Sequence, residues 1–235
     1  MNVLNFKLLL VAAALTASLA QASTEIIVNG GFETGNFTGW ETNEKGGSAL
    51  FVESGFVSPA TAYPTIGPNT GRFYALADGP LGATSLVQRF SLGTVSSALL
   101  SFDMFVNSGA ANAVHATGLD QTTGGSYEPN QHVRVDILSG IANAFDTGSG
   151  VLGTYYLGIN RPMGDLNYSH NQIDVTGLLG DGGSYQLRFA QVNNQNYLLQ
   201  GIDNVSLTVT PVPEPKTYAL MVAGLGLIRF AVRRR

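Results

Sequence analysis

Asp203 is the acidic residue whose position first suggests a binding site. It has the same parity as Val205, Leu207 and Val209, so in a regular strand its carboxylate would start on the core-facing side. An unpaired charge there is costly, and the carboxylate therefore needs a partner. Two partners fit the sequence. One is a calcium ion, which takes carboxylate oxygens and carbonyl oxygens such as those of the turn at residues 29–31. The other is a set of backbone amides in a turn that Asp203 caps.

The residue types that most often carry out catalysis form no recognisable constellation. The histidines His115, His132 and His170 show no paired-ligand spacing, and the chain has no cysteine, no GxSxG elbow and no nucleotide loop. The nearest candidates for the carboxylate pair of a glycoside hydrolase are Asp103 and Asp136. Both alternate with apolar neighbours, as is typical of a solvated sheet face. The sequence therefore favours a protein that is not an enzyme, with a polysaccharide-acting hydrolase as the alternative.

Aromatic and amide side chains offer candidates for contacts with sugars. Trp40 closes the turn at residues 36–40 and is expected to pack at the edge of the core rather than face a ligand. Tyr155 and Tyr156 are adjacent, so one of them should face outward in a strand. The amides of residues 193–197 can bond hydroxyl groups, but such turns are also common for conformational reasons. None of these residues identifies a ligand.

The elements that must position these side chains are β-strands. The chain of 235 residues has 29 glycines, few charges and almost no window of helical periodicity. Alternation predicts strands with one apolar face at residues 100–106, 132–138 and 185–189. Further strands are expected at residues 25–29, 48–53, 72–78, 84–90, 153–158, 172–175 and 202–209. About ten short strands predict an all-β fold, a two-sheet jelly-roll sandwich.

The first 22 residues have the organisation of a secretory signal peptide. Lys7 precedes an apolar stretch from residue 8 to residue 20, and the small-x-small cleavage site consists of Ala20, Gln21 and Ala22. Cleavage after Ala22 would leave Ser23 as the first residue. Residues 1–22 are therefore excluded from the fold, and one β-sandwich domain is expected over residues 23–210.

Residues 211–235 have three parts that indicate sorting. A stiff spacer comes first and a basic cluster last, formed by Pro213, Glu214 and Pro215 and by Arg233, Arg234 and Arg235. The apolar run between them, residues 218–232, has about 15 residues, fewer than the ~20 of a stable spanning helix, and Arg229 interrupts it. It predicts a short transmembrane helix that serves as a temporary anchor. The terminal arginines would stay on the cytoplasmic side.

This order of parts resembles a PEP-CTERM sorting signal. The resemblance implies an exported protein of a Gram-negative bacterium that makes exopolysaccharide. It also implies an exosortase of the inner membrane as the processing partner, with a cut at or near Pro213, Glu214 and Pro215. Arg229 stands where many members of the family carry a small or apolar residue. The alternatives are an ordinary C-terminal membrane anchor and a buried hairpin.

Two motifs at opposite ends of the predicted domain resemble galactose-binding-like jelly rolls, the fold of many carbohydrate-binding modules. They are residues 26–40 and residues 201–207, which match the first and last strands of that fold. In such folds the terminal strands lie close together, and a carboxylate from each often holds a structural calcium. The resemblance implies that Glu33 and Asp203 are these two residues. If there is no metal, Glu33 is expected to be solvated.

Without the end segments the domain is strongly acidic. Residues 23–212 contain 6 basic and 15 acidic residues, a net charge of −9. This charge argues against nucleic acid and anionic lipid surfaces as partners and suits cations or neutral sugars. Because no disulfide can form, the domain must draw its stability from an extensive core or from bound metal.

The sequence therefore predicts an exported, non-enzymatic protein of the cell surface or the exopolysaccharide matrix. Its role would be structural or carbohydrate-binding, with extracellular polysaccharide as the partner. The chain would be anchored in the inner membrane for a time before delivery. A protein-binding adhesin is a further alternative.

Overall fold

The computed structural model describes residues 22–109, 118–121, 129–158 and 167–213, together with 224–226, 229 and 232–233. Several residues with predicted roles lie outside this part of the chain: Ala20, His115, Glu214, Pro215, Arg234 and Arg235. Of the predicted membrane anchor only residues 224–226, 229 and 232 are described. None of the helices in the described ranges has both the length and the apolar character needed to cross a bilayer.

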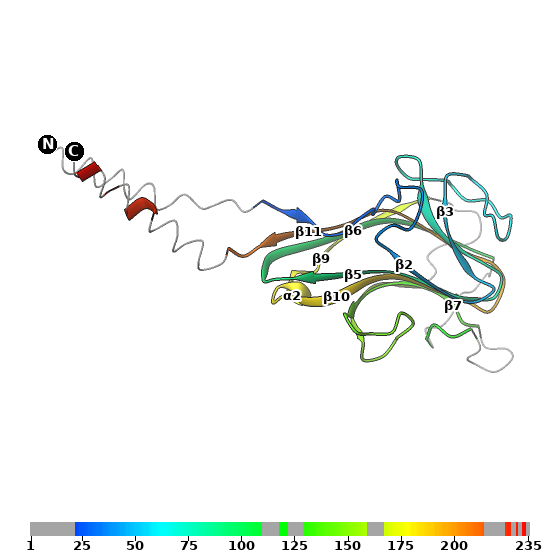
Figure 1. Cartoon of the computed structure of the whole chain (residues 1–235). Coiled ribbons are helices and arrows are strands. Elements are labelled where there is room, and N and C mark those ends of the chain that lie inside the picture. The colour runs from blue at the N-terminus through cyan, green and yellow to red at the C-terminus, as the bar shows by residue number, and fades with distance from the viewer. Residues whose placement is uncertain are drawn as a thin grey trace.

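Two sheets packed face to face form the domain (Figure 1). Sheet A contains, in spatial order, β3 (Ala49–Glu53), β4 (Tyr74–Asp78), β11 (Leu198–Pro211), β6 (Val95–Ser108) and β9 (Ser169–Asp174), and β1 (Thr24–Glu25) also pairs with β11. Sheet B contains β2 (Glu41–Gly46), β5 (Gly82–Leu92), β10 (Gly183–Asn193), β7 (Gln131–Ser139) and β8 (Val151–Gly158). All strand pairs are antiparallel, and a short helix, α2 (Thr176–Leu179), follows β9. The predicted all-β, two-sheet sandwich is confirmed.

The core lies between the sheets and uses the alternating apolar positions that the sequence predicts. Its buried side chains include Leu100, Phe102, Met104 and Val106 of β6, Val133, Val135 and Ile137 of β7, and Tyr185, Leu187 and Phe189 of β10. Trp40 is buried against the rings of Phe32 and Phe189, and its indole N–H donates to the carbonyl oxygen of Asn29 at 3.2 Å. The prediction that Trp40 packs at the core rather than facing a ligand is confirmed.

Near the N-terminus, one strand prediction is wrong and one strand was not predicted. The strand expected at residues 25–29 ends at Glu25, because the chain turns there: Asn29 and Phe32 have left-handed backbones, with φ of 54° and 57°. Gly30 lies against the carbonyl oxygen of Val205, where a Cβ atom would collide with it. Strand β2 was not predicted at all. Its exposed, charged residues carry no apolar alternation.

A β-bulge in β11 overturns the predicted orientation of Asp203. The register of β11 against β6 shifts between Asp203 and Ser206, and Asn204 has a φ of 51°. The extra residue changes the parity, so Asp203 lies opposite Asp103 on the face of sheet A that points away from the core. A second bulge, in β8, places both Tyr155 and Tyr156 against the core. The prediction that one of these tyrosines faces outward is therefore wrong.

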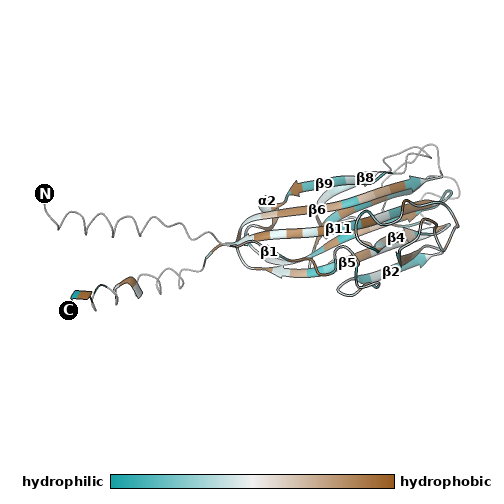
Figure 2. Cartoon of the chain, turned by 90° about the horizontal axis from the view of Figure 1, so that it is seen from above, coloured by the Kyte–Doolittle hydropathy of each residue, from teal (hydrophilic) through white to brown (hydrophobic). Residues whose placement is uncertain are grey.

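Loops cover the outer faces of both sheets. Over sheet A, Ile66 packs on an apolar cluster that includes Tyr74, Phe105 and Leu199. Over sheet B, Phe145 packs on Ala83, Leu119, Ala190 and Val192. Figure 2 shows polar and apolar residues alternating along the strands of the sandwich. Side chains that would be solvated on an open sheet are therefore buried here.

The chain enters and leaves the sandwich at the same end. Thr24 pairs with Val209 and Glu25 with Thr208, which brings β1 beside the last residues of β11. We name this end of the sandwich, where β1 lies beside the last residues of β11 (Figure 1), the tail pole. The opposite end, where β6 ends at Ser108 and β11 begins at Leu198, is the far pole.

Candidate functional site

The loop between β3 and β4, residues 54–73, is the most elaborate described feature outside the sheets, and the buried carboxylate of Asp78 holds its first half. Asp78 accepts hydrogen bonds from the hydroxyl of Ser58 and, at 2.7 Å, from that of Thr61. The amide of Gly79 donates to the other carboxylate oxygen at 2.6 Å. These contacts fix the turn at residues 58–62 against the end of β4.

Asp203 holds the second half of the loop. One of its oxygens accepts the amides of Asn69 and Thr70, at 2.8 and 3.0 Å, and the other accepts the amide of Asn204 at 2.7 Å. Burial raises the pKa of Asp203, while the three amide hydrogen bonds act in the opposite direction. Of the two partners considered for Asp203, a calcium ion and a set of backbone amides, the structure therefore shows the backbone amides.

Glu33 holds the same loop from the N-terminal side. Its carboxylate accepts the amides of Arg72 and Phe73 at 2.9 and 3.0 Å. A Cβ atom on Gly31 would lie 3.7 Å from Asp203 Oδ1 and 3.8 Å from Glu33 Cγ, so the two acidic side chains flank one glycine. The structure thus brings together the two residues that the galactose-binding-like resemblance pairs. Glu33 is exposed to solvent, and its carboxylate is also hydrogen-bonded to backbone amides.

The arrangement around Glu33 and Asp203 fits a calcium ion poorly. All four carboxylate oxygens face N–H donors, which would repel a cation. Across the described ranges, no group of three or more histidine or acidic side chains is arranged to hold a metal. Calcium at these two residues stays a prediction, and the amides account for the burial of Asp203 without it.

Asp103 extends this polar cluster toward the surface. It accepts the side-chain amides of Asn69 and Asn204, both at 2.7 Å, and it bonds Nδ1 of the exposed His170 at 2.6 Å. Asp136 lies on the outer face of the other sheet, with the core between the two carboxylates. They cannot flank one substrate as a glycosidase pair would. Both are buried, so the expectation of a solvated sheet face is also wrong.

The loop displays three apolar side chains, which we name the aromatic patch: Phe56, Val57 and Tyr63. Phe56 is 66% exposed and Tyr63 39%. Tyr63 stacks on Tyr197 with 3.7 Å between ring centroids, and a bridge between Val57 and Pro64 joins the two arms of the loop. Tyr197 directly precedes β11, so the patch lies toward the far pole. The exposed rings thus lie on a loop that three carboxylates hold to the sandwich, an arrangement that lowers the entropy cost of binding a ligand.

Sequence reasoning missed the aromatic patch. Residues 54–71 lie between the strands expected at residues 48–53 and 72–78, and nothing in their composition separates an exposed Phe56 from a core phenylalanine. A usable signal is the lack of strand or helix periodicity around Phe56 and Tyr63, because an aromatic residue without a periodic apolar face has no obvious core to join.

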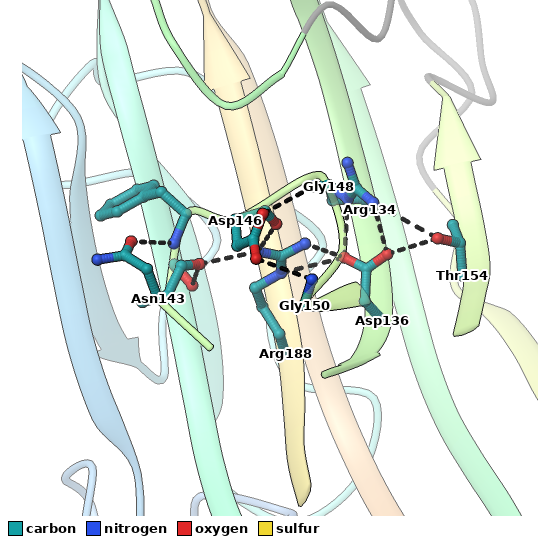
Figure 3. A network of polar contacts seen from close by, with 11 residues as sticks. Arg134, Asp136, Asn143, Asp146, Gly148, Gly150, Thr154 and Arg188 are labelled. Atoms are coloured by element: carbon teal, nitrogen blue, oxygen red, sulfur yellow. Dashed lines mark hydrogen bonds and ion pairs between the residues drawn. The ribbon is translucent and has the colours of Figure 1, made fainter. Parts of the chain in front are cut away.

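The outer face of sheet B holds a buried ion network rather than an open binding surface (Figure 3). Asp136 accepts hydrogen bonds from Arg134 at 2.7 and 2.8 Å and from Arg188 at 2.6 and 3.0 Å. Arg188 also donates to the carbonyl oxygens of Ala144 and Asp146, at 2.9 and 2.6 Å. Both arginines and Asp136 are buried. The network fixes the loop at residues 140–150 over the sheet.

His132 lies on the same face of β7 as Arg134 and is also buried. Among the described residues, neither ring nitrogen has a hydrogen-bond partner. Desolvation, and then the charge of Arg134, lower the pKa of His132 to about 4. The hydrogen bond that usually orients the ring of a general base or a metal ligand is not made by His132 within the described part of the chain.

The amide-rich turn at residues 193–197 serves the backbone. The side chain of Asn193 donates to the carbonyl oxygen of Gly79 at 3.2 Å and accepts from Gln131 at 2.9 Å. The side chain of Asn196 accepts the amide of Tyr197 at 2.9 Å. The amides of this turn were expected either to bond sugar hydroxyl groups or to stabilise the turn itself. The second role is confirmed for Asn193 and Asn196.

Comparison with known proteins yields similarity of fold alone. No protein-family model matches the chain, and no curated protein matches it. Among solved structures, TmCBM61 in complex with β-1,4-galactotriose is 14% identical, with a TM-score of 0.45, over 78% of this chain and 98% of that one. The K3 cleaved adhesin domain of Lys-gingipain from Porphyromonas gingivalis is 14% identical, with a TM-score of 0.49, over 80% and 99% of the two chains. The Stig cyclase Fisc from Fischerella sp. TAU is 19% identical, with a TM-score of 0.47, over 82% and 100%.

Proposed function

We propose that the chain is an exported, non-enzymatic β-sandwich protein whose aromatic patch contacts extracellular polysaccharide. Attachment would be through the tail, at the opposite end of the sandwich. The observation that carries the proposal is the position of the first and last strands of the sandwich. Because β1 and the last residues of β11 lie side by side, any attachment through the tail leaves the far pole free. The exposed rings of Phe56 and Tyr63 lie toward that pole.

Polysaccharide suits the aromatic patch for two physical reasons. The faces of sugar rings carry C–H groups, which pack on exposed aromatic rings while the hydroxyl groups remain in water. The net charge of −9 over residues 23–212 disfavours anionic partners, so a neutral polysaccharide is the preferred ligand. The candidate carboxylate pair of a hydrolase, Asp103 and Asp136, is divided between the outer faces of the two sheets.

The tail completes the proposal. Its resemblance to a PEP-CTERM signal supports export, transient anchoring in the inner membrane and processing by an exosortase at or near Pro213, Glu214 and Pro215. The chain would then reach the cell surface or the exopolysaccharide matrix of a Gram-negative bacterium. The arginines at the end of the chain would keep the C-terminus cytoplasmic until the cut.

A binding assay on immobilised neutral polysaccharide tests this function. We expect the exported chain to be retained, and Phe56→Ala and Tyr63→Ala each to weaken retention roughly tenfold, the effect of losing an exposed aromatic anchor. Val28→Ala is the matched control, because Val28 is an exposed apolar residue outside the aromatic patch. Equal loss in all three variants, or no retention of the unmodified chain, would overturn the proposal. Release of reducing ends would favour the hydrolase alternative.

A further inference from the structure

The core between the two sheets is apolar over most of its length, but it becomes polar toward the far pole. On sheet B, Thr84 of β5 pairs with Gln191 of β10. Each lies two residues from a side chain of the core, Leu86 or Phe189, so both point into the space between the sheets. Thr84 and Gln191 are fully buried there.

Gln200 of β11 has the corresponding position on sheet A. It pairs with the core residue Ala77 of β4 and is itself buried. The side-chain amide of Gln191 crosses between the sheets and donates to the carbonyl oxygen of Leu198 at 3.4 Å, two residues before Gln200. The side chains of Thr84, Gln191 and Gln200 therefore belong to one level of the core, which we name the inner polar layer.

Three oxygen atoms of the inner polar layer have no hydrogen-bond partner among the described residues. They are Thr84 Oγ1, Gln191 Oε1 and Gln200 Oε1. The N–H groups of the two amides are directed elsewhere, to the carbonyl oxygen of Leu198 and to the sulfur of Met104. A buried amide oxygen without a donor destabilises the folded state. The layer therefore needs donors that the described side chains around it do not supply.

We propose that the inner polar layer binds a buried water molecule that bridges the two sheets. Water has two donors, which suit Gln191 Oε1 on sheet B and Gln200 Oε1 on sheet A, and it can accept from the hydroxyl of Thr84. About three hydrogen bonds are usual for a buried water in a protein. Ala77, beside Gln200, contributes only a methyl group to this level of the core and so leaves more room than a larger apolar residue.

A cation suits the inner polar layer less well than water. The three oxygens carry no formal charge. The carboxylate nearest in register is that of Glu44, which pairs with Thr84 but is exposed and accepts the amide of Leu50 at 2.7 Å. An ion held by the neutral oxygens alone would keep its charge uncompensated in the core. The inference does not depend on the sorting tail or on polysaccharide binding.

Relaxation dispersion of water oxygen-17 tests the proposal in the exported chain, because it registers long-lived internal water and is not affected by exchanging hydrogens. We expect a signal from the unmodified chain that falls by one water molecule in the double variant Gln191→Met, Gln200→Met. Gln88→Met is the matched control, since Gln88 is buried but uses both ends of its amide on the backbone of Val28. An unchanged signal in the double variant, or an equal loss in Gln88→Met, would overturn the proposal.

Melting temperatures give a second readout, and the single variants serve if the double variant does not fold. With the water in place, Gln191→Met and Gln200→Met should each lower the melting temperature, because the water loses one of its partners. Without it, each substitution would remove an unpaired buried oxygen and raise the melting temperature, which would contradict the proposal. A melting temperature of the unmodified chain that differs between sodium, potassium and choline chloride would indicate an ion in the layer and would also overturn it.

Discussion

Asp136 neutralises one of the two arginines that contact it, so the buried cluster on sheet B keeps one positive charge. Arg188 also donates hydrogen bonds to the carbonyl oxygens of Ala144 and Asp146. The hydroxyl of Thr154 donates to Asp136 at 2.8 Å. Burial lowers the pKa of Arg188, and the adjacent carboxylate opposes that shift. Asp136 and these carbonyl groups replace the water that Arg188 loses on burial.

Removing the charge of Asp136 should therefore be far more costly than removing a surface charge. We expect Asp136→Asn to lower the free energy of unfolding by about 3–5 kcal/mol, because two buried guanidinium groups would then face each other without a counter-ion. The control is Glu41→Gln, which removes the exposed pair with Arg89, worth less than about 1 kcal/mol. Urea denaturation measures both. Similar losses in the two variants would contradict the assigned network.

His132 should make the domain less stable in acid. Its folded-state pKa of about 4 lies below the ordinary value of 6.5, so the unfolded chain binds more protons between these values. The contribution of neutral His132 to the free energy of unfolding is therefore fully present above pH 6.5. The free energy of unfolding falls by roughly 3 kcal/mol as the pH drops toward 4. His132→Leu should remove that part of the pH dependence. Denaturation at several pH values compares the two proteins, and parallel pH profiles would contradict the prediction.

At the scale of elements, three acidic side chains hold one loop, and two of them are Glu33 and Asp203, the residues at which calcium was predicted. We expect calcium to leave the melting temperature of the unmodified domain unchanged. Asp203→Ala should lower the free energy of unfolding by roughly 1–3 kcal/mol with or without calcium, because it leaves the amides of Asn69 and Thr70 without their hydrogen-bond acceptor. A calcium-dependent rise in the melting temperature that disappears in Asp203→Ala would instead support the metal site.

Alternation in the sequence was enough to predict the strands that face the core, and it failed where pairing with a neighbour sets the geometry. The residues of β6, β7 and β10 keep a strict period of two because one face is always buried. The bulges at Asn204 and Tyr155 depend on how β11 and β8 meet their partners, which a local pattern does not contain. The carboxylate contacts are equally remote, since Asn69 and Asp203 are 134 positions apart.

At the scale of the molecule, both predicted processing sites flank one folded unit. Ala22 and Pro213 bound the described sandwich, so two cuts would release it intact. We expect mass spectrometry of the exported protein to find a chain that begins at Ser23 and ends at or near residues 213–215. A full-length chain of 235 residues in the cytoplasm would contradict both the signal peptide and the sorting signal.

The pairing of β11 with β6 also sets how the molecule resists being pulled. A tail fixed at Val212 and a ligand at the opposite end would load β11 along its own axis. The hydrogen bonds that join it to β6, from Leu198 to Pro211, run across that axis. They would bear the load together, in shear, instead of opening one after another like a zipper. The strand that continues into the tail is thus the one best placed to carry tension under flow.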